Sequence, residues 1–502
     1  MTTQANNGAR PSQALGNGDA SQELTLEIGA VAHGGHCVTR ISEAGPDKGR
    51  VVFVRHALPG ETVRARVTEK GKVWRADCLE VLANPSPYRV PSRWPEAGPG
   101  GVGGGELAHV SSQGQRRWKA AVVREQLQRL AGLDVSEFAP ALDVDANTLE
   151  GESPGVESVS EAGYESGYRT RIEFVTDENG HPAMAGHRSN QFVPLASVPL
   201  ATPALADFLE NKGTWRGELP SNSRLTAVVP NGRSAAEGVL LAVENHPTPK
   251  QPTPKQPTQN NSPAPQPNAK HPKRPTSTEP ITKERASTDS TVVETVQLGD
   301  TTYQYQVAAD GFWQVHDQAP AWLVQWVLEA AALSAGQRVL DLYAGAGLFT
   351  VPLAAAVGPG GEVKAVEGDR EAVANAALNA KEYPQVSVIN SGVLQALTPR
   401  RKNSKQGTKK TRKESELLSE KPYDVVVLDP PRVGAGQQVI QKVAALKPKR
   451  IVYVACDPAA LARDIAYLAP YGYRMTALKA ADLFPHTHHV ECVATLELTL
   501  TN

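Results

Sequence analysis

The last third of the chain constrains the fold more than any other part. From residue 322 to residue 502, short apolar runs rich in Val, Ile and Leu alternate with helical patterns. Strands that are joined through helices pair in parallel, and the helices then cover both faces of the sheet. The pattern predicts an α/β fold, a doubly wound Rossmann-like sheet in a C-terminal domain at residues 311–502. Open sheets of this kind carry their chemistry at the carboxyl ends of the strands.

The N-terminal part follows a different pattern. Five short alternating stretches, separated by turns that contain Gly or Pro, occupy residues 24–28, 37–41, 50–54, 61–69 and 74–81. Strands at this spacing predict a small, OB-like β-barrel at residues 21–84. A basic barrel of this size favours RNA binding, although a solvated face remains the alternative. The basic residues are Arg40, Lys48, Arg50, Arg55, Arg64, Arg66, Lys70, Lys72 and Arg75.

Residues 85–310 combine both patterns and predict a mixed central domain that also binds RNA. A helix is expected at residues 116–130, and strands are expected at residues 168–175 and 185–194. Four basic side chains of this region are compatible with phosphate contacts. They are Arg169, Arg171, His187 and Arg188.

Three segments have compositions that cannot build a core. Residues 1–20 are predicted to form a disordered tail, and residues 246–290 a disordered Pro-rich insertion in the central domain. A basic insertion at residues 399–421 interrupts the C-terminal domain, with eight basic residues and no acid between 400 and 413. Both insertions could contact a polyanion or remain solvated loops.

The overall composition excludes several classes of protein. With 502 residues the chain is too long for one core, and its 52 basic and 53 acidic residues leave a net charge of −1, so no global basic field exists. The four cysteines are far apart and form no CxxC pair, which argues against a disulfide framework and against a cysteine-rich metal site. No apolar run of 18 residues occurs and the N-terminus is polar. A cytoplasmic protein without a membrane segment is therefore expected.

A glycine turn in the C-terminal domain predicts the cofactor. Gly345 and Gly347 follow a strand and let the backbone approach a ligand closely. Thr350 stands where a third glycine would complete a dinucleotide fingerprint, which weakens a pyrophosphate interpretation. Asp341 lies before the turn, and Glu367 ends the next strand, where it can accept hydrogen bonds from a ribose. These acids fit S-adenosylmethionine better than NAD.

Two further strands end at reactive side chains. Asp429 follows a buried strand and precedes two prolines and Arg432, a stiff loop suited to holding a planar base beside a methyl donor. Cys456 ends another strand, and Asp457 is placed to cap the helix that begins at the next residue. A helix N-terminus favours a thiolate, so Cys456 is a candidate nucleophile.

Taken together, these motifs, with the run from Phe312 to His316 and the run from His488 to Glu491, resemble the RNA 5-methyluridine methyltransferase family. The resemblance implies S-adenosylmethionine-dependent methylation of C5 of a uridine in tRNA or 23S rRNA, through a covalent adduct at C6. It identifies the N-terminal barrel as similar to a TRAM domain. It implies that Cys456 is the nucleophile and Glu491 the base. The residues expected to contact the cofactor or the target base are Gln314, Tyr343, Gly345, Gly347, Glu367 and Asp429.

The chain departs from the family pattern in two places. Residues 92–110 contain no cysteine, so the iron–sulfur cluster of many relatives is not expected, and no metal is predicted. Asn390, Ser391 and Gly392 stand where an acid often binds adenine. His488 and His489 either orient the base or pack. Two alternatives stay open, an RNA cytosine-C5 methyltransferase and a non-catalytic RNA-binding protein with a methyltransferase fold. A monomer is favoured.

Overall fold

The computed structural model describes residues 22–151, 154–159, 167–189, 191–243, 291–398 and 422–499. The predicted N-terminal tail, the Pro-rich insertion and the basic insertion lie outside the described residues.

The N-terminal residues form a six-stranded sheet with the strand order β1-β5-β6-β4-β3-β2. Alternation builds it, because residues such as Leu24 and Leu26 of β1 point inward while their neighbours are exposed. All five predicted strands are present, and the additional strand is the two-residue β2. Arg64 and Arg66 pair with Glu23, and Arg55 is 5% exposed, so these arginines are not a free basic face. The strands are β1 (Glu23–Glu27), β2 (Val31–Ala32), β3 (His36–Arg40), β4 (Val51–Arg55), β5 (Thr62–Glu69) and β6 (Trp74–Ala83).

The C-terminal part contains an eight-stranded sheet with the order β17-β16-β15-β18-β19-β21-β20-β7. Five of these strands run parallel, as the alternating pattern predicted, and β20 and β21 add an antiparallel hairpin at one edge. The parallel strands are β15 (Arg338–Leu342), β16 (Glu362–Glu367), β17 (Val386–Asn390), β18 (Val425–Leu428) and β19 (Arg450–Ala455). The others are β20 (Tyr473–Asp482), β21 (Glu491–Leu498) and β7 (Glu157–Ser158), which pairs with β20.

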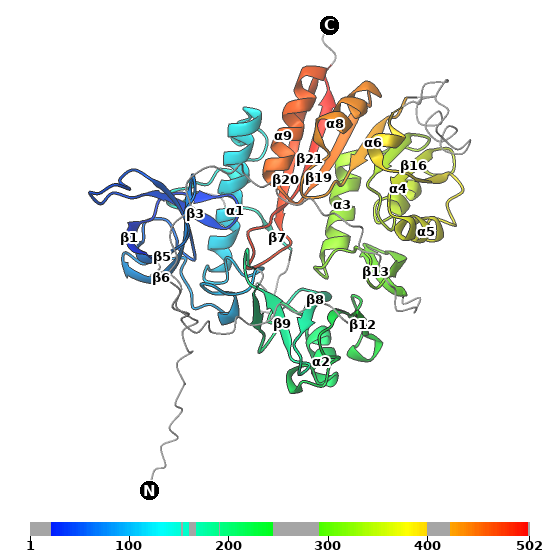
Figure 1. The fold of residues 1–502 in the computed structure, drawn as a ribbon. Helices are drawn as coiled ribbons and strands as arrows, with labels where there is room; N and C mark the ends of the chain where they lie inside the picture. Colours follow the sequence, from blue (N-terminus) through cyan, green and yellow to red (C-terminus); the bar gives the residue numbers. More distant parts are fainter. Residues whose placement is uncertain are drawn as a thin grey trace, which may run out of the picture.

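Helices cover both faces of this sheet, which confirms the predicted Rossmann-like layers (Figure 1). Apolar residues of α6, α8 and α9 share one core with the sheet, and those of α3 and α4 share the core on the other face. The helices are α3 (Ala319–Ala331), α4 (Thr350–Val357), α5 (Arg370–Asn379), α6 (Val393–Ala396), α8 (Gly436–Ala445) and α9 (Pro458–Leu468). The Asp457 side chain caps α9 by accepting from the Ala460 amide at 2.8 Å, as predicted.

Helix α1 (Ser112–Gln126) lies between the N-terminal sheet and the C-terminal sheet (Figure 1). Its N-cap is Ser111, which accepts from the Gly114 amide, so the helix begins four residues before the predicted start. Trp118 and the alanines that follow it belong to a core shared with the N-terminal strands and α9. Lys119 is fully buried and forms an ion pair with Asp482 at the end of β20. This helix therefore joins the two sheets into one packed body.

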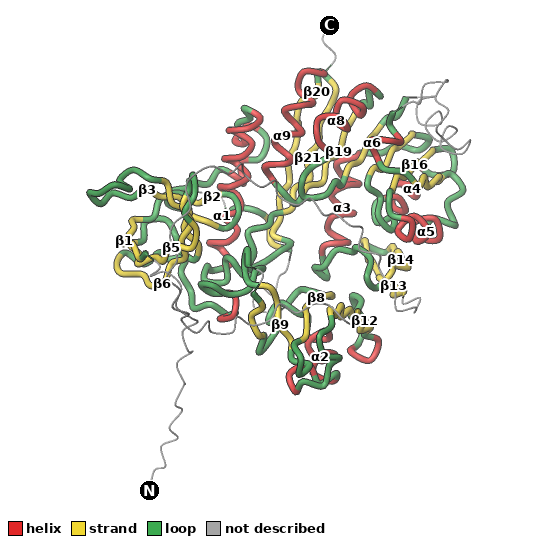
Figure 2. The backbone as a smooth tube through the Cα atoms, viewed as in Figure 1, coloured by secondary structure: helices red, strands yellow, loops and turns green. Residues whose placement is uncertain are grey.

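The middle of the chain forms a smaller sheet with the order β10-β9-β8-β11-β12, covered by helix α2 (Figure 2). The prediction that Arg171 is compatible with a phosphate contact is wrong, because its side chain is buried and donates to Glu294 at 2.8 Å and to the Gly311 carbonyl at 2.9 Å. No helix among the described residues is long and apolar enough to span a membrane. The elements are β8 (Arg171–Thr176), β9 (Pro182–Ala185), β10 (Phe192–Pro194), α2 (Pro203–Asn211), β11 (Arg224–Val228) and β12 (Val239–Val243), followed by the hairpin of β13 (Thr291–Leu298) and β14 (Thr301–Ala308).

Candidate active site

Five of the predicted site residues meet at one edge of the eight-stranded sheet. Tyr343, Asp429 and Cys456 directly follow the parallel strands β15, β18 and β19, and Glu367 is the last residue of β16. Glu491 is the first residue of β21, which runs antiparallel to β19, so Glu491 lies at the same edge as the end of β19. The carboxyl ends of parallel strands are where open α/β sheets bind ligands. The topology therefore assembles these side chains around one site.

Strand pairing brings Cys456 and Glu491 together. Ala455 pairs with Cys492 in the antiparallel register, which places the residue after Ala455 opposite the residue before Cys492. Burial and the charges of Glu491 and Asp429 together raise the pKa of the Cys456 thiol to about 12, while Arg432 acts in the other direction. The expectation that the helix N-terminus favours a thiolate is therefore wrong for the free protein. Desolvation and the acids Glu491, Asp429 and Asp457 outweigh the helix.

The two acids beside Cys456 bind their protons more tightly than ordinary carboxyl groups. Glu491 is 3% exposed, and burial together with the charge of Asp429 raises its pKa well above the usual value, with Arg432 opposing. Burial and the charge of Asp341 raise the pKa of Asp429 to about 7. A group that holds its proton near neutral pH is suited to general acid and base chemistry.

The glycine turn has the geometry of a ligand-binding loop. Gly345 and Gly347 have φ of 55° and 92°, conformations that side-chain-bearing residues rarely adopt. The Gly345 amide donates to Glu367 Oε2 at 3.0 Å, which holds the predicted ribose-binding carboxylate against the turn. The amides of Gly368 and Asp369 donate to the other oxygen of Glu367 at 2.7 and 2.8 Å. Three backbone amides thus hold the Glu367 carboxylate beside the turn.

Asp341 lies beneath this turn and is 0% exposed. Thr350 donates to its Oδ2 at 2.5 Å, whereas its Oδ1 is buried without a hydrogen-bond partner. Burial raises the pKa of Asp341 to about 7, and the charge of Glu367 contributes in the same direction. A buried, half-satisfied acid beside a glycine turn fits a ligand that carries positive charge, and S-adenosylmethionine carries an ammonium and a sulfonium group.

Tyr343 and Gln314 occupy different parts of the fold. Tyr343 has an unusual positive φ of 65°, and its amide donates to the Val366 carbonyl at 3.0 Å, which turns the chain out of the sheet at the glycine turn. Gln314 is 8% exposed and lies in the loop between β14 and α3, where the neighbouring Val315 carbonyl accepts from the Thr170 amide at 2.9 Å. Among the hydrogen bonds of the described residues, none joins Gln314 to the other site residues.

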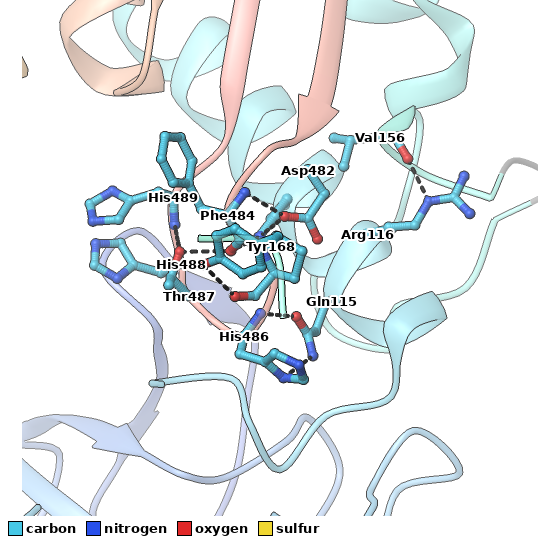
Figure 3. Close-up of polar contacts among 12 residues, drawn as sticks. Gln115, Arg116, Val156, Tyr168, Asp482, Phe484, His486, Thr487, His488 and His489 are labelled. Atoms are coloured by element: carbon cyan, nitrogen blue, oxygen red, sulfur yellow. Dashed lines mark hydrogen bonds and ion pairs between the residues drawn. The ribbon is translucent and has the colours of Figure 1, made fainter. Parts of the chain in front are cut away.

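The segment that leads from β20 into Glu491 is held from several sides (Figure 3). The His486 amide donates to Gln115 Oε1 at 2.6 Å, and the hydroxyl of Tyr168 donates to the Pro485 carbonyl at 3.1 Å. Lys119 adds a hydrogen bond to the Phe484 carbonyl at 3.0 Å. These supports come from helix α1 and the central domain, and the sequence offered no signal for them.

His488 and His489 stand side by side in this segment, and their rings point away from Gln115 (Figure 3). Their ring centroids are 4.1 Å apart. His488 Nδ1 lies 3.5 Å from Glu106 Oε2. Burial and the charges of His488 and Arg432 lower the pKa of His489 to about 3, so it is neutral at physiological pH. The charge of Arg432 therefore acts on His489, whereas the ring of His488 lies beside Glu106.

The loop that carries Asp429 and Arg432 is fixed by a buried acid on α9. Asp464 is 2% exposed and accepts from the amides of Ala435 and Gly436 at 2.7 and 3.2 Å. It also accepts from the hydroxyl of Tyr453 at 2.5 Å. Asp464 was not predicted from the sequence, although an acid on the apolar face of a helix is a possible signal. No group of three or more His, Cys, Asp or Glu side chains suited to a metal ion occurs within the described ranges.

The glycine turn after the first parallel strand, the acid that ends the second strand and the layered sheet together define a Rossmann-like methyltransferase of class I. Comparisons with known proteins agree with this class. A family model described as tRNA (Uracil-5-)-methyltransferase matches residues 282–499, and a TRAM domain model matches residues 21–71. The predicted similarity of the N-terminal barrel to a TRAM domain is thereby confirmed.

Individual relatives cover nearly the whole chain. An "uncharacterized RNA methyltransferase" of Streptomyces coelicolor is 36% identical over 498 residues, 95% of this chain and 93% of the relative. The 23S rRNA (uracil(1939)-C(5))-methyltransferase RlmD of Acinetobacter baumannii is 28% identical over 487 residues, 95% of this chain and 96% of the relative. The tRNA (uracil-54, C5)-methyltransferase of Pyrococcus abyssi, solved with S-adenosyl-L-homocysteine, shares the fold, with a TM-score of 0.54, 21% identity and coverage of 92% of this chain and 100% of that chain. The chain belongs to the family of S-adenosylmethionine-dependent RNA uracil-C5 methyltransferases.

Proposed function

We propose that this protein methylates C5 of a uridine in structured RNA through a covalent bond between Cys456 and C6 of the base. The observation that carries the proposal is the strand register that sets Cys456 opposite Glu491. Asp429 and Arg432 complete the group of charges around the thiol. A nucleophile beside a base, at the edge of the sheet that also holds the donor loop, is what the reaction requires.

The chemistry explains why each residue type is needed. C5 of uracil is a poor nucleophile until the Cys456 sulfur adds to C6, which moves the ring electrons toward C5 and O4. C5 then takes the methyl group from the sulfonium centre, and S-adenosylhomocysteine leaves. The Glu491 carboxylate removes the hydrogen from C5, the C5–C6 double bond re-forms and the C6–S bond breaks. The last step releases the Cys456 sulfur as a thiolate, and Glu491 keeps the proton taken from C5.

The raised pKa of Cys456 places a condition on this reaction. In the free protein the thiol is protonated, because burial disfavours the thiolate and ionisation of Glu491 or Asp429 disfavours it further. Positive charge from the bound donor compensates those carboxylates, and Arg432 already acts in that direction. The thiolate therefore forms mainly after the donor has bound. This order protects a reactive sulfur from adventitious reaction.

The residues of the donor loop fit S-adenosylmethionine. Glu367, held by three backbone amides, offers acceptor capacity to a ribose, and the unpartnered Oδ1 of Asp341 lies under the turn. Tyr343 and Gln314 stay predicted contacts to the donor or to the base. The donor supplies an electrophilic methyl group, and the chain supplies the orientation.

The substrate proposed is an RNA whose target uridine can leave its stack, such as a loop or an opened stem. The named relatives act on 23S rRNA and on tRNA, so these are the two RNAs to assay. Both occur in the cytoplasm, which is the proposed location. The TRAM domain and the central domain are proposed to hold the RNA, and a monomer is the form we propose.

The test is nucleoside analysis of 23S rRNA and tRNA after incubation with the protein and S-adenosylmethionine. We expect 5-methyluridine with the wild-type protein and none with Cys456→Ala. The matched control is Cys492→Ala, which removes a buried sulfur one residue from Glu491 and should retain methyl transfer. Formation of 5-methylcytidine would instead support the cytosine alternative. Absence of any methylated nucleoside, with donor binding intact, would support the non-catalytic one.

A further inference from the structure

A turn of the TRAM domain reaches the residue next to the proposed nucleophile. His33 lies between β2 and β3, and its Nε2 is 3.0 Å from Oδ2 of Asp457. Asp457 directly follows Cys456, and its other carboxylate oxygen caps helix α9. The carboxylate accepts from both sides, so the Nε2 of His33 carries the hydrogen. This contact joins residues that are 424 positions apart in the chain.

The turn is closely fitted to the segment that joins β20 to β21 and to the loop before α1. Gly35 has φ of 75°, and a Cβ added there would lie 3.0 Å from the Cβ of Glu106 and 3.2 Å from that of His488. The ring of His33 stands edge-on to that of His488, with centroids 6.3 Å apart. The turn therefore forms a wall beside the segment that ends at Glu491.

We propose that His33 is a positioning residue for Cys456, acting through Asp457, so that the TRAM domain takes part in the chemistry as well as in RNA binding. The proposal rests on the proposed function, which makes Cys456 the nucleophile. Two physical effects follow from the contact. The hydrogen bond holds the Asp457 carboxylate in its capping position, which fixes the turn that carries the sulfur. The hydrogen bond also partly neutralises the negative charge of Asp457 beside the thiol.

The charge effect has a defined direction. Burial raises the pKa of Asp457, but the hydrogen bond and charge of His33 and the amides of Ala459 and Ala460 together outweigh it and lower the pKa. The carboxylate is therefore ionised, and the hydrogen bond from His33 partly neutralises its charge. Asp457 belongs to the acids that oppose the Cys456 thiolate, together with Glu491 and Asp429, and Arg432 is the opposing cation. Loss of His33 leaves the Asp457 charge less compensated, with only the backbone amides at the start of α9 as donors. The fraction of thiolate at a given pH then falls.

The test measures the reactivity of the sulfur separately from RNA methylation. Alkylation of Cys456 by iodoacetamide is followed by peptide mass spectrometry between pH 7 and pH 10, without RNA. We expect His33→Ala to slow alkylation at least about threefold at pH 8 and to shift the pH profile upward, since fewer thiols are ionised. His33→Gln, which keeps an N–H near the position of Nε2, should restore most of the rate.

A double-mutant cycle assigns the effect to Asp457. Asp457→Asn keeps an oxygen to cap α9 and removes the charge, so the thiol should react at least as fast as in the wild type. Adding His33→Ala to this variant should then change little. Equal alkylation rates in the wild type and in His33→Ala would overturn the proposal. So would a similar slowing by His33→Ala in both backgrounds.

Single-turnover methyl transfer links the contact to catalysis. His33→Ala should lower the rate at saturating RNA at least about threefold, with RNA affinity changed less than twofold, whereas Lys72→Ala, an exposed side chain on the same domain, should affect only RNA affinity. A loss of RNA affinity alone in His33→Ala would contradict the proposal. If Cys456→Ala retained methyl transfer, the proposed function would fail, while the alkylation cycle would still report on the contact.

Discussion

Asp341, which we propose to contribute to donor binding, destabilises the fold when its buried carboxyl group is ionised. Its carboxyl group is completely buried, with one oxygen lacking a partner, and burial raises its pKa from 3.8 to about 7. A raised pKa means that the stability contributed by this group is fully present below pH 4 and is lost as the pH rises through 7. Asn has the same shape and keeps an oxygen for the Thr350 hydroxyl, but it carries no charge at any pH.

The size of the effect follows from the two pKa values. A difference of about three units corresponds to roughly 4 kcal/mol in the free energy of unfolding. We therefore expect Asp341→Asn to stabilise the free protein by up to about 4 kcal/mol at pH 8, and by less than half of that at pH 5. For a unit of about 200 residues, this equals a rise in Tm of about 10 °C at pH 8.

Differential scanning calorimetry at pH 5 and pH 8 measures this difference. Asp424→Asn is the matched control, because Asp424 lies beside the same sheet with the opposite shift. Burial acts on it too, but hydrogen bonds from the Arg338 amide and Lys449 lower its pKa, so its replacement should destabilise the protein at pH 8. The reasoning would be refuted if Asp341→Asn lowered the Tm at pH 8, or raised it equally at both pH values. The same variant should bind S-adenosylmethionine more weakly.

Three further predictions concern the donor, the base and the supporting contacts. Because the pKa values of Asp341 and Asp429 are about 7, the affinity for S-adenosylmethionine, measured by calorimetry, should rise about tenfold between pH 6 and pH 8. S-adenosylhomocysteine, which lacks the sulfonium charge, should show a smaller rise. Equal rises for the two molecules would contradict the role of these acids. Glu491→Gln should still form the RNA adduct but release it slowly, so a protein–RNA band should accumulate in denaturing gels, and rapid release would exclude Glu491 as the base. Lys119→Met should lower stability by about 3–5 kcal/mol, because it removes the cation that compensates the buried Asp482 carboxylate. Lys119→Met with Asp482→Leu should recover most of the denaturant midpoint, and no recovery would show that the pair itself is needed.

The parts of the site that sequence analysis could predict are those set by local pattern. An apolar strand that stops at Cys456 and a capping Asp457 are visible within ten residues, and the rule that parallel strands end at one edge brings Asp429 into the same site. The parallel sheet and the barrel strands follow from periodicity in the same way. The β20–β21 hairpin sets the partner of Cys456, and the family resemblance supplied that partner, Glu491.

Contacts between distant segments were beyond this kind of prediction. His33 and Lys119 find their partners hundreds of positions away, and nothing in their neighbourhoods distinguishes them from surface residues. Arg171 was interpreted as compatible with a phosphate contact because the burial of one basic side chain cannot be read from its own strand. The expected thiolate failed for a related reason, since the acids that raise the pKa of Cys456 come from other strands.

The covalent bond to RNA is tested most directly with a substrate that cannot complete the reaction. RNA that contains 5-fluorouridine at the target position can accept the sulfur and the methyl group, but it has no hydrogen at C5 for Glu491 to remove. Mass spectrometry of the digested protein, after incubation with this RNA and S-adenosylmethionine, should find a methylated fluorouridine nucleotide on the peptide that carries Cys456. Methyl transfer to normal RNA without any adduct on this peptide from the fluorinated RNA would contradict the account.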